Sequence, residues 1–209
     1  MMKTICYVMV GVLLLLASCT KDNFINTGVS NGRFDGNILE YMSAHSYDWD
    51  STLVMIYHAG VDMVKLFEGN DEEHSVITFF GLTNHSIRRY LLEQGFKQVS
   101  DLDAEWCRSI LLQHVVDGKI YRKDIPEGYP GDYGLAGTGG CYVTTLAGNQ
   151  LWVYVDIQEN GAIVENAARP IFVNFIKTGL TFEVASGDIE PDDAVIHALQ
   201  YDFTLGDEE

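Results

Sequence analysis

The sequence has few basic residues, few cysteines and only one long apolar run. It contains 13 Lys and Arg against 30 Asp and Glu, which gives a formal net charge of −17. Nucleic-acid binding needs clustered Lys and Arg over the phosphates, so this balance argues against a nucleic-acid partner. It argues equally against electrostatic docking on anionic lipid. An apolar content of 47% excludes a disordered chain and predicts one folded domain of ordinary size.

The one apolar run is too short to cross a bilayer. It extends from Ile5 to Ala17 and follows the single charge of Lys3, whereas a spanning helix takes roughly 20 apolar residues. Its length and basic start are typical of a signal peptide. The tetrapeptide that ends at Cys19, Leu-Ala-Ser-Cys, resembles a bacterial lipobox, which implies cleavage before Cys19 and attachment of palmitate-type acyl chains to it. The alternatives are an ordinary cleaved signal and a short buried helix.

Lipidation of Cys19 predicts how the chain is held and where it lies. We expect residues 1–18 to be a lipoprotein signal peptide and residues 19–37 a lipidated tether, since Thr20 to Asn37 is polar and glycine-rich. The membrane partner would be reached through this lipid. We expect a Gram-negative outer membrane lipoprotein of the cell envelope, exposed on the surface, with a periplasm-facing position as the alternative.

Two of the four cysteines stay in the predicted domain. Cys6 leaves with the signal peptide and Cys19 carries the lipid, so Cys107 and Cys141 remain. An exported protein can join such a pair as a disulfide. We expect two unpaired thiols, with one disulfide as the alternative.

Hydrophobic periodicity predicts helices first and strands afterwards. Helical spacing covers residues 38–67, with a turn at 46–50 after which Ser51 would cap a second helix. Further helices are expected from an Asn84 cap to Gly95 and from about Asp103 to Val116. Strands are expected at 75–80, 142–146, 151–156, 171–175 and 195–203.

This order indicates an α+β fold in which N-terminal helices pack against a twisted, mostly antiparallel β-sheet or wedge. The domain would span residues 38–204 and leave 205–209 as an acidic tail. Residues 121–140 form a long loop with several glycines, and long ordered loops are often functional.

No pattern in the sequence predicts catalysis, a metal or a cofactor. The six histidines form no HExxH pair, and the acidic groups at 71–74 and 188–193 lack the spacing of a calcium loop. The glycine-rich stretch 134–140 has no lysine of a phosphate-binding loop and leads into a strand. Cys107 lies in an apolar helix, which disfavours a reactive thiolate. We therefore expect a protein that is not an enzyme and has no cofactor.

Four segments together resemble the fasciclin-domain family. Residues 76–84 (VITFFGLTN) are similar to its TVFAPTN motif, 110–118 (ILLQHVVDG) to LLYHVVPG, 145–148 (TLAG) to TLNG, and 193–199 (DAVIHAL) to NGVIHVID. They occur in the family's order. Departures at Phe80-Gly81, Asp117 and Asp193-Ala194 put loop geometry in doubt more than the fold.

The resemblance implies a non-enzymatic extracellular module that binds proteins, receptors or glycans. It implies packing roles for four residues, with the His114 side chain bonded to a buried backbone group. These are His114, Val115, Val116 and His197.

Two functions follow as expectations. The first is a lipid-anchored module for adhesion or protein–protein interaction. The second is a surface glycan-binding accessory protein of a polysaccharide-uptake system, because aromatic faces stack on sugar rings. The protein or glycan ligand itself is not identified by the sequence. In the alternative interpretation, Trp152 and Tyr154 face a second core layer. The aromatic residues proposed for binding are Tyr129, Tyr133, Tyr142, Trp152 and Tyr154.

Overall fold

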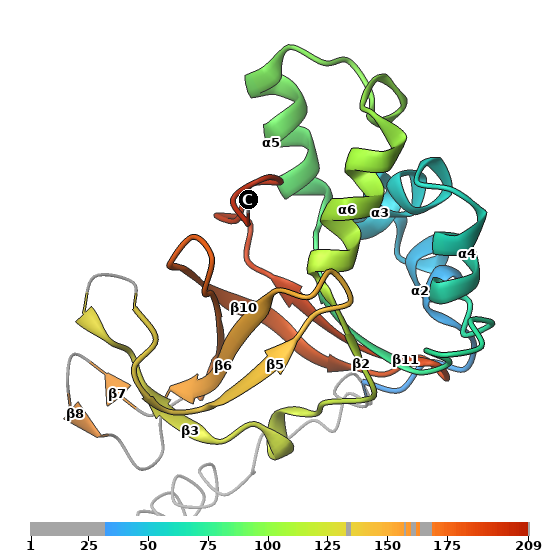
Figure 1. Cartoon of the computed structure of the whole chain (residues 1–209). Helices are drawn as coiled ribbons and strands as arrows, with labels where there is room; N and C mark the ends of the chain where they lie inside the picture. Colours follow the sequence, from blue (N-terminus) through green and yellow to red (C-terminus); the bar gives the residue numbers. More distant parts are fainter. Residues whose placement is uncertain (1–31, 133–134, 157, 160–161, 164–168, 209) are drawn as a thin grey trace, which may run out of the picture. The chain divides into compact units, whose positions relative to one another are not determined.

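The domain has a layer of helices against one face of a curled sheet (Figure 1). The computed structural model describes residues 32–132, 135–156, 158–159, 162–163 and 169–208. Within these residues no helix has the length and apolar character needed to cross a membrane. The predicted signal peptide and Cys19 lie outside the described residues.

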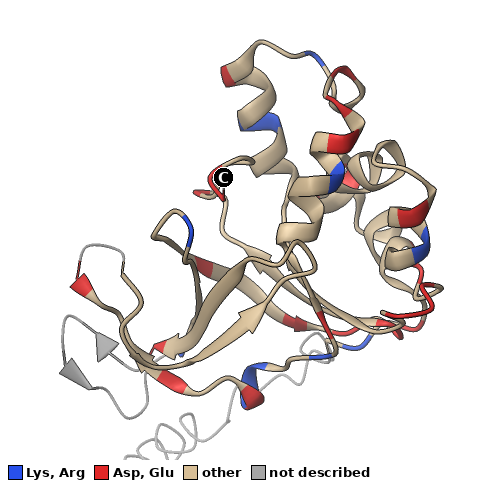
Figure 2. Ribbon diagram, in the orientation of Figure 1, with Lys and Arg blue, Asp and Glu red and all other residues tan. Residues whose placement is uncertain are grey.

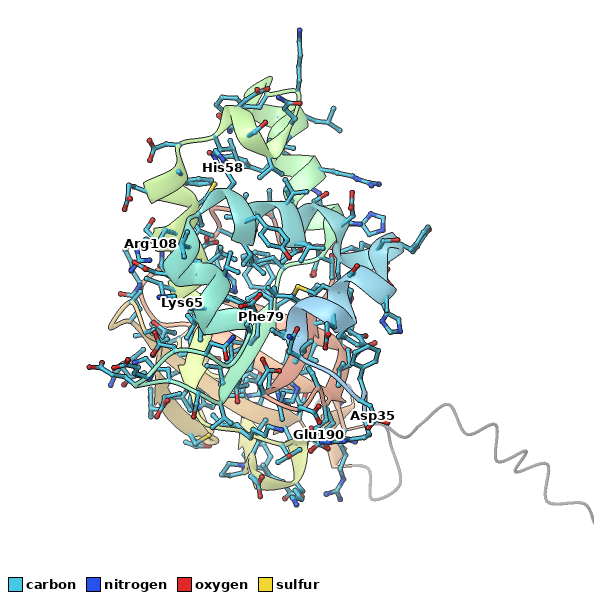
Figure 3. All side chains as sticks on the ribbon, turned by 90° about the vertical axis from the view of Figure 1, so that its right-hand side faces the viewer. Asp35, His58, Lys65, Phe79, Arg108 and Glu190 are labelled. Atoms are coloured by element: carbon cyan, nitrogen blue, oxygen red, sulfur yellow. The ribbon has the colours of Figure 1, made fainter. Side chains whose placement is uncertain are left out.

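The described chain starts with a short extended segment that is fixed to the sheet. The Phe34 amide donates to Glu190 O at 2.9 Å, and the Glu190 amide donates to Gly32 O at 2.6 Å. Figure 3 shows Asp35 beside Glu190 at this end of the domain. Arg33 adds an ion pair to Asp192 at 2.5 Å. Residues 32–37, which we predicted to belong to the tether, therefore include backbone paired with the sheet. Backbone pairing with a distant strand causes this difference, and local composition does not reveal it.

Three helices fill the region predicted to be helical. Asn37 and Glu40 form a reciprocal capping box at the start of the first. The predicted turn at 46–50 with a cap at Ser51 is wrong, because the second helix already starts at Ser46 and Ser51 lies inside it. The helices are α2 (Ile38–Ala44), α3 (Ser46–His58) and α4 (Val61–Phe67).

Helices α5 (Asn84–Gln94) and α6 (Ala104–Gln113) follow the first strand. Helix α5 stops at Gly95 as predicted, where φ is +76°. Its N-cap is Thr83 and not Asn84, whose side chain is directed to α3 instead: Oδ1 accepts from the Ser51 amide at 2.6 Å and Nδ2 donates to Tyr47 O at 2.7 Å.

Helix α6 starts close to the predicted position, with Asp103 as its N-cap, and ends earlier than predicted. The Asp103 side chain accepts from the Trp106 amide at 2.8 Å. The predicted extension to Val116 is wrong, because residues 115–117 leave the helix and pair with the first strand. His114 is the C-cap at this change of direction.

Among the described residues, nine strands form one sheet in the order β2-β1-β11-β10-β9-β6-β3-β4, with β5 also paired to β6. Most pairs are antiparallel, but two are parallel. Strand β1 runs parallel to β11, with Ile77 opposite Ala194, and β3 runs parallel to β6. A separate two-stranded ribbon is formed by β7 (Gln158–Glu159) and β8 (Ala162–Ile163). The strands of the large sheet are β1 (Ile77–Gly81), β2 (Val115–Asp117), β3 (Glu127–Tyr129), β4 (Thr138–Gly139), β5 (Cys141–Thr144), β6 (Gln150–Asp156), β9 (Ile171–Phe175), β10 (Leu180–Ile189) and β11 (Ala194–Leu199).

The last two strands differ from prediction. The sequence gives little sign of β10, because Ser186, Gly187 and Asp188 are poor strand formers and sit where its pairing with β11 shifts register. Strand β11 was predicted to run to 203 with one buried face. It ends at Leu199, and all six of its residues are buried.

The main core lies between the helices and the sheet. Phe79 of β1 is fully buried there and meets the Phe67 ring edge-on at 5.1 Å. Figure 3 labels Phe79 under the helical layer. Burial of each such ring contributes about 2–3 kcal/mol to folding. The predicted α+β class, with N-terminal helices packed on a mostly antiparallel sheet, is confirmed.

Candidate functional site

The predicted aromatic binding residues differ widely in their exposure. Tyr133, like Cys19, lies outside the described residues. Tyr142 on β5 is 57% exposed, whereas Trp152 and Tyr154 on β6 are only 1% and 2% exposed. Tyr129 on β3 is half-buried. The structure therefore does not bring the five rings together on one open surface.

Trp152 and Tyr154 form a small aromatic stack on the face of β6 opposite the main core. Their ring centroids lie 4.2 Å apart, and Tyr154 stacks on Phe172 of β9 at 5.4 Å. The indole Nε1–H of Trp152 donates to Gly139 O at 3.0 Å. Burial on both faces of β6 agrees with the alternative that these two rings belong to a second core layer.

Glycines in the 121–140 segment allow it to lie against this stack. A Cβ on Gly128 would lie 2.6 Å from Cβ of Tyr154, and a Cβ on Gly140 would lie 2.6 Å from Nε1 of Trp152. Gly140 also has φ +60°, which favours glycine. Part of the glycine-rich loop is therefore a cover over two aromatic side chains, held by strands β3 and β4.

A different group of aromatic residues lines an open cleft of about 270 Å³. The cleft lies between the first turns of α3 and α5, helix α2, and strands β10 and β11. We call it the aromatic cleft. The residues that give it its chemical character are Tyr41, Asp48, Trp49, His85, Ser186 and Tyr201.

Ring contacts position the walls of the aromatic cleft. Tyr41 meets the buried Trp49 at 6.4 Å and stacks on His45 at 4.2 Å between centroids. On the opposite side, His85 and Tyr201 meet edge-on at 6.3 Å. Tyr201 is 66% exposed. One wall is therefore anchored in the core through Trp49, and the other stands free toward solvent.

The polar groups of the cleft are suited to hydrogen bonding. Burial raises the pKa of Tyr41, a hydrogen bond with Trp49 lowers it in part, and Asp48 raises it again. Tyr41 therefore keeps its proton at neutral pH and remains a donor. Asp48 adds an exposed carboxylate acceptor and Ser186 an exposed hydroxyl.

The two remaining cysteines are free thiols, as we expected, and neither is poised as a nucleophile. Burial, followed by the charge of Asp103, raises the pKa of the Cys107 thiol to about 11. Burial also raises the pKa of Cys141. Both therefore stay protonated at neutral pH, whereas the thiolate is the reactive form. In the described part of the chain, no group of three His, Cys, Asp or Glu side chains is arranged to hold a metal ion.

A second, larger cleft is lined by both basic and acidic side chains. It measures about 580 Å³ and includes Arg122, Lys123 and Arg169. Arg169 pairs with Glu127 at 2.7 Å, and the Arg122 guanidinium donates to Arg169 O. Acidic side chains are spread over both layers of the domain (Figure 2). Two acidic residues of the lining, Glu127 and Asp188, therefore offset part of the positive charge of this cleft.

The histidines of the fasciclin-like motifs are bonded core residues, as predicted. His114 Nδ1 lies 2.9 Å from Phe80 O, and His197 Nε2 lies 2.9 Å from Ile120 O. Burial lowers the pKa of His197, so its ring is neutral at pH 7. Val115 and Val116 are buried in β2. All four residues therefore stabilise the fold.

Sequence reasoning missed the aromatic cleft. Its residues come from segments far apart in the chain, and Tyr201 was assigned to the last strand although it lies just beyond β11. Asn84, which was predicted as a cap, lies near the cleft without lining it. Its side chain bonds the start of α5 to the backbone of α3 and so holds two walls of the cleft together.

No family model matches the sequence, and no curated protein matches it. Among solved structures, the chain is similar to a FAS1 domain pair from the insect cell adhesion molecule fasciclin I, with 13% identity and a TM-score of 0.46. The similarity covers 75% of this chain and 45% of that chain, so the chain spans less than half of the solved structure. That structure is from the family that the sequence motifs resemble. Membership of this family remains a prediction.

Proposed function

We propose that the chain is a non-enzymatic, fasciclin-like binding module of the cell envelope, and that it serves adhesion or protein–protein interaction. The observation that carries the proposal is the aromatic cleft, an open surface hollow with rings on both walls. Aromatic side chains are enriched at the centres of protein interfaces, since they give much contact area for little conformational entropy. The similar structure is named as part of a cell adhesion molecule, which agrees with this function.

The surroundings of the cleft extend the same surface. Tyr47 precedes Asp48 in α3 and is 84% exposed, and His85 at the start of α5 is exposed as well. Large exposed rings gathered around one hollow are characteristic of an interaction site. Because the domain is strongly acidic, a partner with a basic surface would associate faster and with fewer competitors.

The anchor is a lipid on Cys19 in the outer membrane. It is supported by the lipobox-like tetrapeptide and the short apolar run before it. A Cys19→Ala variant should appear in the soluble fraction, because the lipid is the proposed attachment to the bilayer. A Ser18→Ala variant keeps the cysteine and should stay with the membrane. A Cys19→Ala protein that remains membrane-bound would refute the anchor.

The cleft can be tested with a matched pair of tyrosines. A photo-crosslinking amino acid placed at Tyr47 in intact cells should capture a discrete envelope partner. The same residue at Tyr142, which is exposed on β5, should not capture that partner. Tyr201→Ala should then weaken the purified complex by about tenfold or more, as for an interface anchor, and Tyr142→Ala should leave it unchanged. Equal capture from both positions would contradict the proposal.

The second candidate function is glycan binding, and the polar lining of the cleft favours it. Asp48 and Ser186 offer hydrogen bonds to sugar hydroxyls beside the Tyr201 ring, which can stack on a sugar face. Trp152 and Tyr154 are too deeply buried to take part, so Tyr129, Tyr133 and Tyr142 remain from the predicted set. A glycan array should give a hit that Tyr201→Ala removes and Tyr142→Ala retains. If Tyr142→Ala removed the hit and Tyr201→Ala did not, the sugar-binding site would lie at β5 and not in the aromatic cleft.

A further inference from the structure

The lining of the aromatic cleft contains a carboxylate but no strongly basic side chain. Asp48 lies in the first turn of α3 and is exposed, and among the described residues that line the cleft there is no Lys or Arg. Within the described part of the chain, Asp48 takes part in no salt bridge. Burial is the main cause of the raised pKa of Tyr41, and the charge of Asp48 raises it further. The carboxylate therefore acts on the aromatic wall and has no cation of its own.

A second oxygen in the lining of the cleft has no partner. Thr83 is the N-cap of α5, but its side chain makes no capping hydrogen bond. Its Oγ1 is buried and has no hydrogen-bond partner among the described residues. A threonine at this position ordinarily accepts from an amide of the first helical turn, and buried polar atoms are ordinarily bonded. The unpaired oxygen of Thr83 therefore indicates a donor that a bound group would supply.

Aromatic rings and a small volume further restrict what the cleft can hold. Tyr201 is 66% exposed, and its ring meets His85 edge-on at 6.3 Å. The face of such a ring is negative and attracts a cation that lies within about 6 Å of its centroid. The cleft measures about 270 Å³, which is less than the roughly 300–1,000 Å³ of pockets for drug-sized ligands. It therefore suits a single cationic side chain.

We propose that the aromatic cleft binds a guanidinium group, presented as an arginine side chain of the protein partner. A guanidinium is planar and always charged, stacks on aromatic faces and has five N–H donors. Asp48 pairs with its charge, the hydroxyl oxygens of Thr83 and Ser186 accept further N–H groups, and the Tyr201 ring covers its plane. A lysine ammonium has three donors and a more strongly hydrated charge, so it fits less well. This inference rests on the proposed protein-binding function and names the chemistry that the partner brings.

The charges around the cleft agree with a cationic group from a different protein. Arg89 meets the backbone of the Tyr201 wall, but its guanidinium donates to the carbonyl groups of residues 201 and 202 and to the Thr204 hydroxyl. Asp202 follows Tyr201 in the chain and is exposed. The whole chain has 30 acidic against 13 basic residues. Its field draws cations toward the cleft and disfavours a second copy of this chain as the partner.

The test titrates the full chain with three end-blocked tripeptides that have a glycine on each side of arginine, lysine or citrulline. Citrulline has nearly the shape of arginine but no charge. Two-dimensional ¹H–¹⁵N NMR reports which amides shift. The arginine peptide should shift the amides of residues 48, 83 and 201, with a Kd on the order of 1 mM for one side chain. The lysine peptide should bind about threefold more weakly, and the citrulline peptide should not shift these amides.

Three variants should weaken binding of the arginine peptide. Asp48→Asn removes the charge and should raise the Kd about fivefold, the upper end for an exposed ion pair. Tyr201→Ala removes the stacking face and should raise it about two- to fivefold. Thr83→Val keeps the side-chain shape without the oxygen and should raise it about fivefold. Asp50→Asn is the matched control for Asp48→Asn, because Asp50 is exposed on the same helix and does not line the cleft. It should keep the native Kd.

Three results would overturn the guanidinium site: no shifts at the cleft, equal binding of the arginine and citrulline peptides, or equal weakening by Asp48→Asn and Asp50→Asn. The peptide titration uses no partner protein, so its outcome separates from that of the crosslinking experiment at Tyr47. A captured partner without arginine binding would keep the protein-binding function and refute the guanidinium site. Arginine binding without a captured partner would keep the chemistry of the cleft and count against the protein-binding function.

Discussion

Two groups of aromatic side chains in this domain have similar composition and opposite surroundings. The Trp152–Tyr154 stack is covered by the glycine-rich segment that carries β3 and β4. In the aromatic cleft, Trp49 is just as buried, but Tyr201 faces solvent and nothing among the described residues covers it. The difference shows that the cover, and not the type of ring, separates a packing layer from an open surface that could bind a partner. The predictions below test this contrast.

The largest effect is expected at the covered stack. Trp152→Ala should lower the free energy of unfolding by about 3–5 kcal/mol, because it removes a fully buried ring and the bond to Gly139 O. Urea denaturation followed by circular dichroism measures the loss. A decrease below about 1 kcal/mol would show that the cover does not form in solution.

The cover itself can be tested with two glycines. Gly140→Ala should cost about 2–3 kcal/mol, since its Cβ would lie 2.6 Å from Trp152 Nε1 and 2.8 Å from Val153 O. Gly148 has a similar positive φ of +82° with open space around it. Gly148→Ala should cost only about 1 kcal/mol, from backbone strain alone. Equal losses in urea denaturation would mean that Gly140 does not approach the stack.

Carboxylate side chains also differ between a partly buried position, Asp193, and an exposed position in the aromatic cleft, Asp48. Burial, partly opposed by hydrogen bonds, raises the pKa of Asp193 to about 6. Its ordinary value is lower, so the group stabilises the fold at acid pH and this contribution is lost as pH rises through about 6. Asp193→Asn should therefore add about 1 kcal/mol at pH 7, a value reduced for partial exposure, and nothing near pH 4. Asp48→Asn, at an exposed carboxylate, should change stability little at either pH.

The smallest effect on stability is expected at the open cleft. Tyr201→Ala should change the free energy of unfolding by less than about 0.5 kcal/mol, because the side chain is mostly exposed. The same substitution should have the largest effect on partner binding. A stability loss comparable to that of Trp152→Ala would place Tyr201 in the packing of the domain and weaken its assignment to the binding surface.

Much of the fold could be predicted because local chemistry determines it. Asp103 caps α6 and Gly95 ends α5, and both signals depend on residues within one turn. Strand β10 was missed because its second half contains Ser186, Gly187 and Asp188, which are poor strand formers, and is held by irregular pairing with the distant strand β11. Likewise, Val115 and Val116 fit a helical period but gain more from pairing with β1.

The site was harder to predict than the fold. The alternation of side chains along β6 correctly indicates that the strand has two faces. Whether the face with Trp152 and Tyr154 meets solvent depends on the segment that carries β3 and β4, which covers it. The aromatic cleft combines Tyr41, Asp48, His85 and Tyr201 from separate elements, so no spacing rule connects them. Glu208 was assigned to an acidic tail because acidic residues are rarely buried, whereas its side chain is fully buried near His114, which is distant in sequence.

The parallel pairing of β1 with β11 has a consequence for how the chain folds. Ile77 lies opposite Ala194, so an interior strand pair of the sheet joins the first strand to the last. Contacts between residues so distant in sequence slow folding, because a large loop must close before they form. The helices can form as the chain emerges from the ribosome, but the sheet cannot close until β11 is available. A chain synthesised only as far as β10 should therefore remain sensitive to protease, and resistance should appear late, in a single step, once β11 is added.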